Sequence, residues 1–163
     1  MTAHIALNLA AFLCSLVAGF LFAFSVVVMP GLKGLDDRAF LEGFRTIDGV
    51  IQRGDPLFGV VWIGSALALI AALVLGLGQL AGPEKGLLAL ATGIYLLGVQ
   101  LPTVAIHIPL NNELQALDVA GADAETVRRA RRRFEPRWNR WNRIRTALAA
   151  LTTAMLLVVL AMP

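Results

Sequence analysis

The chain has 163 residues, of which 58% are hydrophobic and only 15% are charged, with a formal net charge of +3 at pH 7. Soluble domains carry about 25% charged residues, so this composition excludes an ordinary water-soluble domain. Charged side chains are missing from four stretches: 1–32, 56–83, 86–112 and 146–163. A membrane-spanning helix needs about 20 mostly apolar residues. The sequence therefore predicts an all-α fold, a single four-helix transmembrane domain that occupies residues 1–163.

Four spans are expected, and a proline marks one end of each. The first ends before Pro30 and the third before Pro109, because proline disfavours helix in the residue that precedes it. The second and fourth begin at Pro56 and Pro136, since proline is favoured in a first helical turn. The predicted spans are about 5–29, 56–80, 86–108 and 136–161.

Lysine and arginine are concentrated in the two long connectors, which we expect to be partly helical. The first connector carries four of these residues and the second carries nine, whereas the short turn between spans two and three has only Lys85 and the termini have none. The positive-inside rule places such connectors in the cytoplasm. We therefore expect an integral protein of a bacterial inner membrane, with both termini outside.

The run from Arg128 to Arg133 is the most basic segment. We interpret it as a topology determinant and as an anchor for anionic lipid headgroups, and we expect no nucleic-acid binding because no recognition module accompanies it. Small residues recur within the spans, where they permit close helix packing. The same surfaces allow a homo-oligomer. The only cysteine, Cys14, excludes an intramolecular disulfide.

Polar side chains at membrane depth are costly and often functional. On the third span they share one helix face, and on the fourth they follow its first turns. If these two helices are neighbours, their polar residues enclose an apolar-walled cavity of the kind that binds small molecules. The residues concerned are Gln100, Thr103, His107, Asn111 and Asn112 on one side and Trp138, Trp141, Asn142 and Arg145 on the other.

The order of motifs along the chain resembles that of the anthrone oxygenase-like family of small four-span membrane proteins. The matching segments are 19–30, Ile47-Asp48 with Gln52 and Pro56-Leu57-Phe58, 107–114, and the positions Trp138, Trp141, Asn142 and Arg145. Position 48, which is often Asn in the family, is Asp here. The resemblance implies a cofactor-independent oxidation of a planar phenolic or polyketide-like molecule by molecular oxygen, as some fungal members oxidise anthrones.

An anthrone has an acidic methylene group, so such an enzyme needs a base, a site for the resulting anion and a flat apolar slot. His107 is our candidate base, since its titration lies near neutral pH. Arg145, Asn111 and Asn142 are the candidates for holding the oxyanion. Trp138 and Trp141 are the candidates for stacking on the substrate rings. The remaining candidate substrate contacts are Gln100, Thr103 and Asn112.

Each of these assignments has a structural alternative. His107 can be an interfacial side chain bonded to a carbonyl, the tryptophans can form an aromatic belt, and Asn142 with Arg145 can form a network between helices. We expect no metal site, because His4 and His107 fall at opposite membrane faces. A carboxylate-assisted site with Asp48, Glu113 or Glu135 is an alternative, but no ligand spacing favours it. The corresponding functional alternative is a non-catalytic membrane protein that binds a small hydrophobic molecule or serves as a partner subunit.

Overall fold

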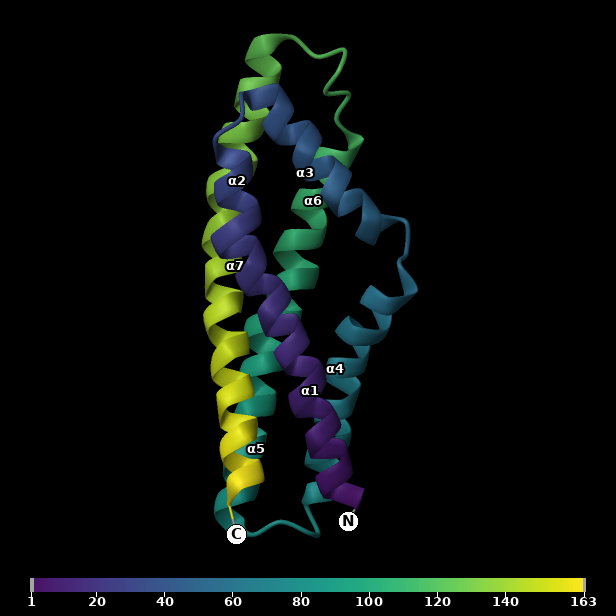
Figure 1. Ribbon diagram of the computed structural model, residues 1–163, viewed down its shortest axis with the longest axis vertical. Helices are drawn as coiled ribbons and strands as arrows, with labels where there is room; N and C mark the ends of the chain where they lie inside the picture. The colour runs from purple at the N-terminus through teal and green to yellow at the C-terminus, as the bar shows by residue number, and fades with distance from the viewer. Residues whose placement is uncertain (1, 163) are drawn as a thin grey trace.

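The structure, a computed structural model, describes residues 2–162 as five continuous helices without a β-strand (Figure 1). Four of them are long and apolar enough to cross a membrane, which confirms the predicted all-α, four-span class. The elements are α1 (Thr2–Ala23), α2 (Met29–Lys33), α3 (Asp37–Gln52), α4 (Pro56–Gly76), α5 (Gly82–Tyr95), α6 (Ile108–Ala116) and α7 (Ala124–Ala161). Helix α1 continues into α2, and α5 continues into α6.

Proline does not end the first and third helices. The prediction that they stop at Pro30 and Pro109 is wrong, because the first continues to Lys33 and the third to Ala116. A π-helical segment precedes each of these prolines and a third precedes Pro102; these segments are Phe24–Val28, Leu96–Gln100 and Thr103–His107.

The π segments explain how the helices pass their prolines. Proline has no N–H for the carbonyl four residues earlier, and its ring clashes with that carbonyl. The carbonyls concerned belong to Val26, Gly98 and Ala105, the central residue of each π segment. The backbone there makes wider hydrogen bonds that span five residues, such as the bond from the Ile108 N–H to the Thr103 carbonyl. The wider turn makes room for the ring, so the helix continues.

Helix α7 begins 12 residues before the predicted start of the fourth span, and Pro136 lies inside it. Its start is fixed by Asp123, whose carboxylate accepts a hydrogen bond from the Thr126 backbone N–H at 2.7 Å. That bond also lowers the pKa of Asp123. The expectation that Pro136 opens the helix is therefore wrong, because a capping aspartate upstream provides a stronger start signal.

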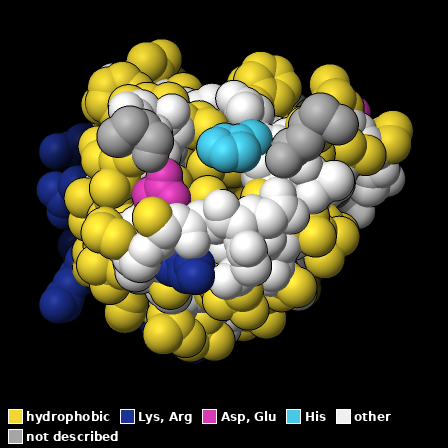
Figure 2. Space-filling view, turned by 90° about the horizontal axis from the view of Figure 1, so that it is seen from below, with side chains coloured by type: hydrophobic (Ala, Val, Ile, Leu, Met, Phe, Trp, Pro, Cys, Tyr) yellow, Lys and Arg dark blue, Asp and Glu magenta, His cyan; other side chains and the backbone are white. Residues whose placement is uncertain are grey.

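The helices form an elongated bundle, and the connections between them are divided between its two ends (Figure 1). Both termini and the α4–α5 turn lie at one end, and the α2–α3 and α6–α7 connections lie at the other. Seen from the terminal end, the surface is mostly hydrophobic with few charged side chains, and most of the visible basic ones gather at one side (Figure 2). Both long connectors are thus on the same end, as expected.

Two hydrophobic clusters fill the bundle. One lies among α1, α4, α5 and α7 and includes Leu69, Tyr95 and Leu156. The other lies at the connector end, where α3 packs against α6 and α7 through Phe40 and Phe44. Helix α3 is amphipathic, since its buried residues recur at helical spacing. It therefore covers the connector end of the bundle.

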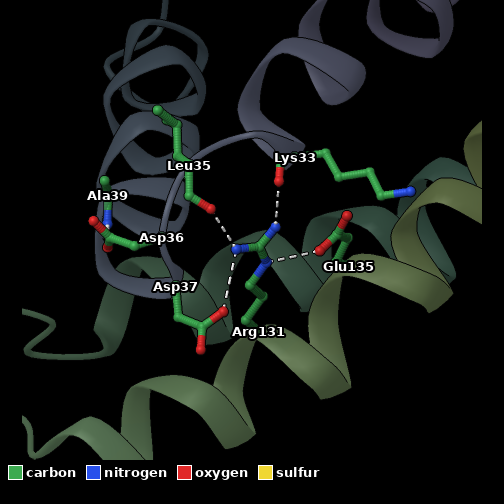
Figure 3. Close-up of polar contacts among 7 residues, drawn as sticks. All are labelled: Lys33, Leu35, Asp36, Asp37, Ala39, Arg131 and Glu135. Atoms are coloured by element: carbon green, nitrogen blue, oxygen red, sulfur yellow. Dashed lines mark hydrogen bonds and ion pairs between the residues drawn. The ribbon is translucent and has the colours of Figure 1, made fainter.

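Arg131 fastens α3 to α7 (Figure 3). Its side chain is only 13% exposed and its guanidinium lies 4.3 Å from the centre of the Phe40 ring. The guanidinium also contacts four oxygens: the Glu135 carboxylate at 2.8 Å, the Asp37 carboxylate at 3.1 Å, and the carbonyls of Leu35 at 2.8 Å and Lys33 at 3.0 Å. One side chain thus holds the end of α2, the start of α3 and α7 together.

Replacing Arg131 with alanine is expected to destabilise the folded state by about 2–3 kcal/mol, because two carbonyls, the Asp37 carboxylate and the largely buried Glu135 carboxylate lose their donor. The exposed Arg132 on the same helix provides the matched control, Arg132→Ala. Hydrogen exchange of the α3 amides checks the prediction: they should exchange faster in Arg131→Ala alone. Equal exchange in both variants would show that α3 is held by other contacts.

Candidate functional site

A cavity of about 260 Å³ lies between the two hydrophobic clusters, slightly below the ~300–1,000 Å³ typical of small-molecule pockets. Its walls come from α1, α3, α4, α7 and the continuous α5–α6 helix. Six aromatic residues line it: Phe20, Phe24, Phe44, Phe58, Trp62 and Trp138. The polar lining residues are Asp48, Gln52, Thr103, His107, Asn111 and Arg145.

Arg145 is buried on α7 and carries its charge into this cavity. Its Nη1 donates to the Thr103 hydroxyl at 2.8 Å and its Nη2 donates to the Asn142 side-chain oxygen at 3.0 Å. Its Nε has no hydrogen-bond partner, and within residues 2–162 it forms no ion pair with a carboxylate. A buried cation without a protein anion is costly and is suited to an anionic ligand.

Asn142 holds the guanidinium from behind. Its amide nitrogen donates to the Leu21 carbonyl at 3.1 Å and to the Ser25 hydroxyl at 2.8 Å. Asn142 therefore joins Arg145 to α1 and lies outside the lining of the cavity. The network between helices that the sequence offered as an alternative is present, and it also fixes where Arg145 points.

His107 ends the π segment that precedes Pro109 and lies 3% exposed. Its Nδ1 is 3.4 Å from the Pro102 carbonyl oxygen, and since a carbonyl only accepts, this contact is a hydrogen bond in the tautomer that carries the proton on Nδ1. Its Nε2 is then the basic nitrogen, and it is buried without a partner among the described residues. The ring stands edge-on to Trp138 at 5.2 Å between centres.

Asp48 lies on α3 at the connector end of the cavity and is 3% exposed. It accepts hydrogen bonds from Asn111 at 2.7 Å, from Gln115 at 2.9 Å and from Gln52 at 3.3 Å. The side-chain oxygen of Asn111 in turn accepts the indole N–H of Trp138 at 3.0 Å. This cluster fixes the Trp138 ring in the cavity wall through Asn111.

The structure brings Thr103, His107, Asn111, Trp138 and Arg145 together around one cavity, with Asn142 behind them. The other three predicted site residues do not line it. Gln100 donates to the Trp62 carbonyl at 3.4 Å, Asn112 accepts from Gln52 at 3.1 Å, and Trp141 is half-buried elsewhere on α7.

The sequence interpretation missed most of the aromatic wall and gave Asp48 no place in the site. The wall residues occur in pairs four residues apart, Phe20 with Phe24 on the first helix and Phe58 with Trp62 on α4. This spacing places each pair on one helix face. It is the feature of the sequence from which the aromatic wall could have been predicted. No group of three or more His, Cys, Asp or Glu side chains in residues 2–162 is placed to hold a metal ion.

A family model described as anthrone oxygenase matches residues 49–155. The matched region contains α4, the continuous α5–α6 helix and most of α7, and it includes His107, Asn111 and Arg145. No curated protein and no solved structure matches the chain. Since the match covers well over half of the sequence and agrees with the order of motifs, the chain belongs to the anthrone oxygenase family.

Proposed function

We propose that this integral membrane protein oxidises a planar phenolic or polyketide-like substrate of the anthrone type with molecular oxygen. The observation that carries the proposal is the meeting of an unpartnered histidine nitrogen and an uncompensated arginine in one aromatic-walled cavity. Family membership supports the reaction class. The six aromatic side chains suit a flat, largely apolar substrate.

The reaction converts the methylene of an anthrone into a carbonyl. His107 Nε2 takes one methylene proton, and the resulting carbanion delocalises its charge onto the ring carbonyl oxygen. Arg145 stabilises that oxyanion, which lowers the barrier to deprotonation. The carbanion reduces O₂ and forms a carbon–oxygen bond to it. Loss of the second methylene proton and cleavage of the oxygen–oxygen bond release one water, so one O₂ yields one quinone carbonyl and one H₂O.

The cavity lies toward the connector end of the bundle, which carries 13 of the 14 lysine and arginine residues. The positive-inside rule makes this the cytoplasmic end, in keeping with a bacterial inner membrane. In the Arg128–Arg133 segment every arginine except Arg131 is exposed, and these exposed side chains are available to anionic headgroups there. Substrate and O₂ would then be bound at the level of the inner leaflet.

A second candidate function is non-catalytic binding of a small hydrophobic molecule, either alone or as a partner subunit. The hydrogen bonds from Asn142 to α1 and from Arg145 to Thr103 favour it, because they also give these residues a structural task. This candidate shares the cavity with the proposed oxygenase and differs from it only in the absence of turnover.

Oxygen uptake by the purified protein in detergent, with a simple anthrone as substrate, tests the proposal. Anthrones oxidise slowly unaided, so a protein-free sample must be measured in parallel. Uptake above that background, with one anthraquinone formed per O₂, is the expected result. Uptake equal to the background across several anthrones, together with retained binding of anthraquinone, would overturn the oxygenase and leave the binding protein.

A further inference from the structure

A second hollow, of about 410 Å³, adjoins the cavity between α1 and the α3–α4 corner. The two hollows share four lining residues, Phe20, Phe24, Ile51 and Phe58. Those side chains therefore have one side toward the cavity and another toward the outer hollow, so they form the wall that separates the two spaces.

The outer hollow, here called the crevice, has a mostly apolar lining; its polar members are Thr46 and Asp55, and the Asp55 carboxylate accepts a hydrogen bond from the Phe58 backbone N–H. Ile47 and Val50 of α3 line it, and Val50 is 49% exposed on the outer surface of the bundle. In the part of the chain that the structure describes, no lysine or arginine lines the crevice, although α3 carries two arginines and Arg53 follows it directly. This mostly apolar lining suits contact with lipid at the level where the first connector meets α4, since exposed basic side chains are avoided at membrane depth.

Two of the residues in the separating wall are phenylalanines whose rings pack against each other. Phe20 of α1 and Phe58 of α4 meet edge to face with ring centres 5.4 Å apart. Phe58 also stacks on Trp62 at 5.5 Å. Partly exposed aromatic side chains change rotamer on a fast timescale, so displacing this pair opens the cavity toward the crevice without moving a helix.

The other sides of the cavity are tied by polar bonds. At the connector end, Asp48 is bonded to Asn111 and Gln115, and the Arg45 side chain donates to the Gln115 carbonyl at 3.2 Å. On the α7 side, Asn142 bonds α1 directly. Opening either side would break partly or fully buried hydrogen bonds, which are costly to leave unmade. A change in the side-chain rotamers of Phe20 and Phe58 breaks no side-chain hydrogen bond, because their rings form none.

We propose that the crevice is a lateral portal through which the substrate passes between the bilayer and the cavity, with Phe20 and Phe58 as its gate. This inference rests on the proposed function for the identity of the occupant, a planar polycyclic aromatic molecule. Such a molecule partitions into lipid because most of its surface is apolar. The portal lets it reach the cavity without crossing water.

Val50→Trp tests the portal, because position 50 lines the crevice but not the cavity. The protein is placed in lipid nanodiscs, and binding of a fluorescent aminoanthraquinone is followed by stopped flow. A bulky side chain in the passage should slow association and dissociation equally, each by about tenfold, while Kd stays unchanged. Val74→Trp is the matched control, since Val74 is 60% exposed on α4 and lies outside the crevice.

Slower exchange at constant Kd in Val50→Trp, but not in Val74→Trp, would support the portal. Val50→Phe introduces a smaller obstruction and should show an intermediate slowing, which also covers a failure of the tryptophan variant to fold. Wild-type exchange rates in a folded variant would overturn the portal. Absence of binding in the wild-type protein would overturn it too, and the oxygen-uptake assay in detergent, which needs no passage through lipid, decides the proposed function separately.

Discussion

Replacing Arg145 with glutamine is expected to lower the turnover of an anthrone about 10²–10³-fold, the usual effect of removing one donor to a developing oxyanion. Among the described residues, 2–162, the buried guanidinium has no carboxylate partner, so its charge is available to the substrate anion. The anion forms only as the methylene loses its proton. The loss should therefore appear in kcat, with KM changing little. Oxygen uptake at saturating and limiting anthrone measures both.

Arg143→Gln is the matched control for this variant, because Arg143 lies on the same helix, is exposed and does not line the cavity. It should turn over like the wild type. Arg145→Lys retains a positive charge but not the planar pair of donors to Thr103 and Asn142, so part of the activity should return. Wild-type kcat in a folded Arg145→Gln protein would remove the oxyanion role.

Replacing His107 with alanine is expected to lower turnover about 10²–10⁴-fold, the range lost with a general base. Its Nε2 is the unpartnered ring nitrogen, because Nδ1 faces the Pro102 carbonyl. The substitution leaves a space in the cavity wall beside Trp138. Added imidazole should fill that space and restore part of the oxygen uptake, with dependence on imidazole concentration.

His4→Ala serves as the control, since His4 is exposed near the N-terminus and remote from the cavity-lining residues. Imidazole should leave its activity unchanged. If His107→Ala were inactive, properly folded and unresponsive to imidazole and to other small bases, a proton-accepting role for His107 would be contradicted. His107 would then have only a structural role, through its hydrogen bond to the Pro102 carbonyl.

The four spans could be predicted from the sequence because apolar length and charge segregation are properties of single segments. The 3.6-residue period of a helix likewise predicts that Thr103 and His107 share one face of the third helix. It also predicts that Asn142 and Arg145 share one face of the fourth. Which helices lie side by side depends on contacts between distant segments. For that reason Phe20 and Phe58, which belong to the two helices not considered for the site, were missed.

The sequence places Asp48 in a segment that matches the family and departs there from its usual Asn, but it gives Asp48 no place in the cavity. Its role became visible because α3 folds over the connector end and because Asn111 and Gln115 of α6 donate to it. Both facts depend on α6 continuing beyond Pro109. The rule that proline disfavours helix in the preceding residue predicts a helix end at Pro109. The widened turn before this proline instead allows the helix to continue.

The widened turns also determine which residues share a face. Each residue advances a π turn by a smaller angle than it advances an α-helix, so side chains spaced for an α-helical face drift apart along the two segments between Leu96 and His107. Gln100 and His107 would align in a regular helix, yet only His107 reaches the cavity. Through the widened turns that they require, the prolines of the third helix determine the direction in which the candidate base points relative to Arg145. The helix achieves this rotation without being interrupted by a loop.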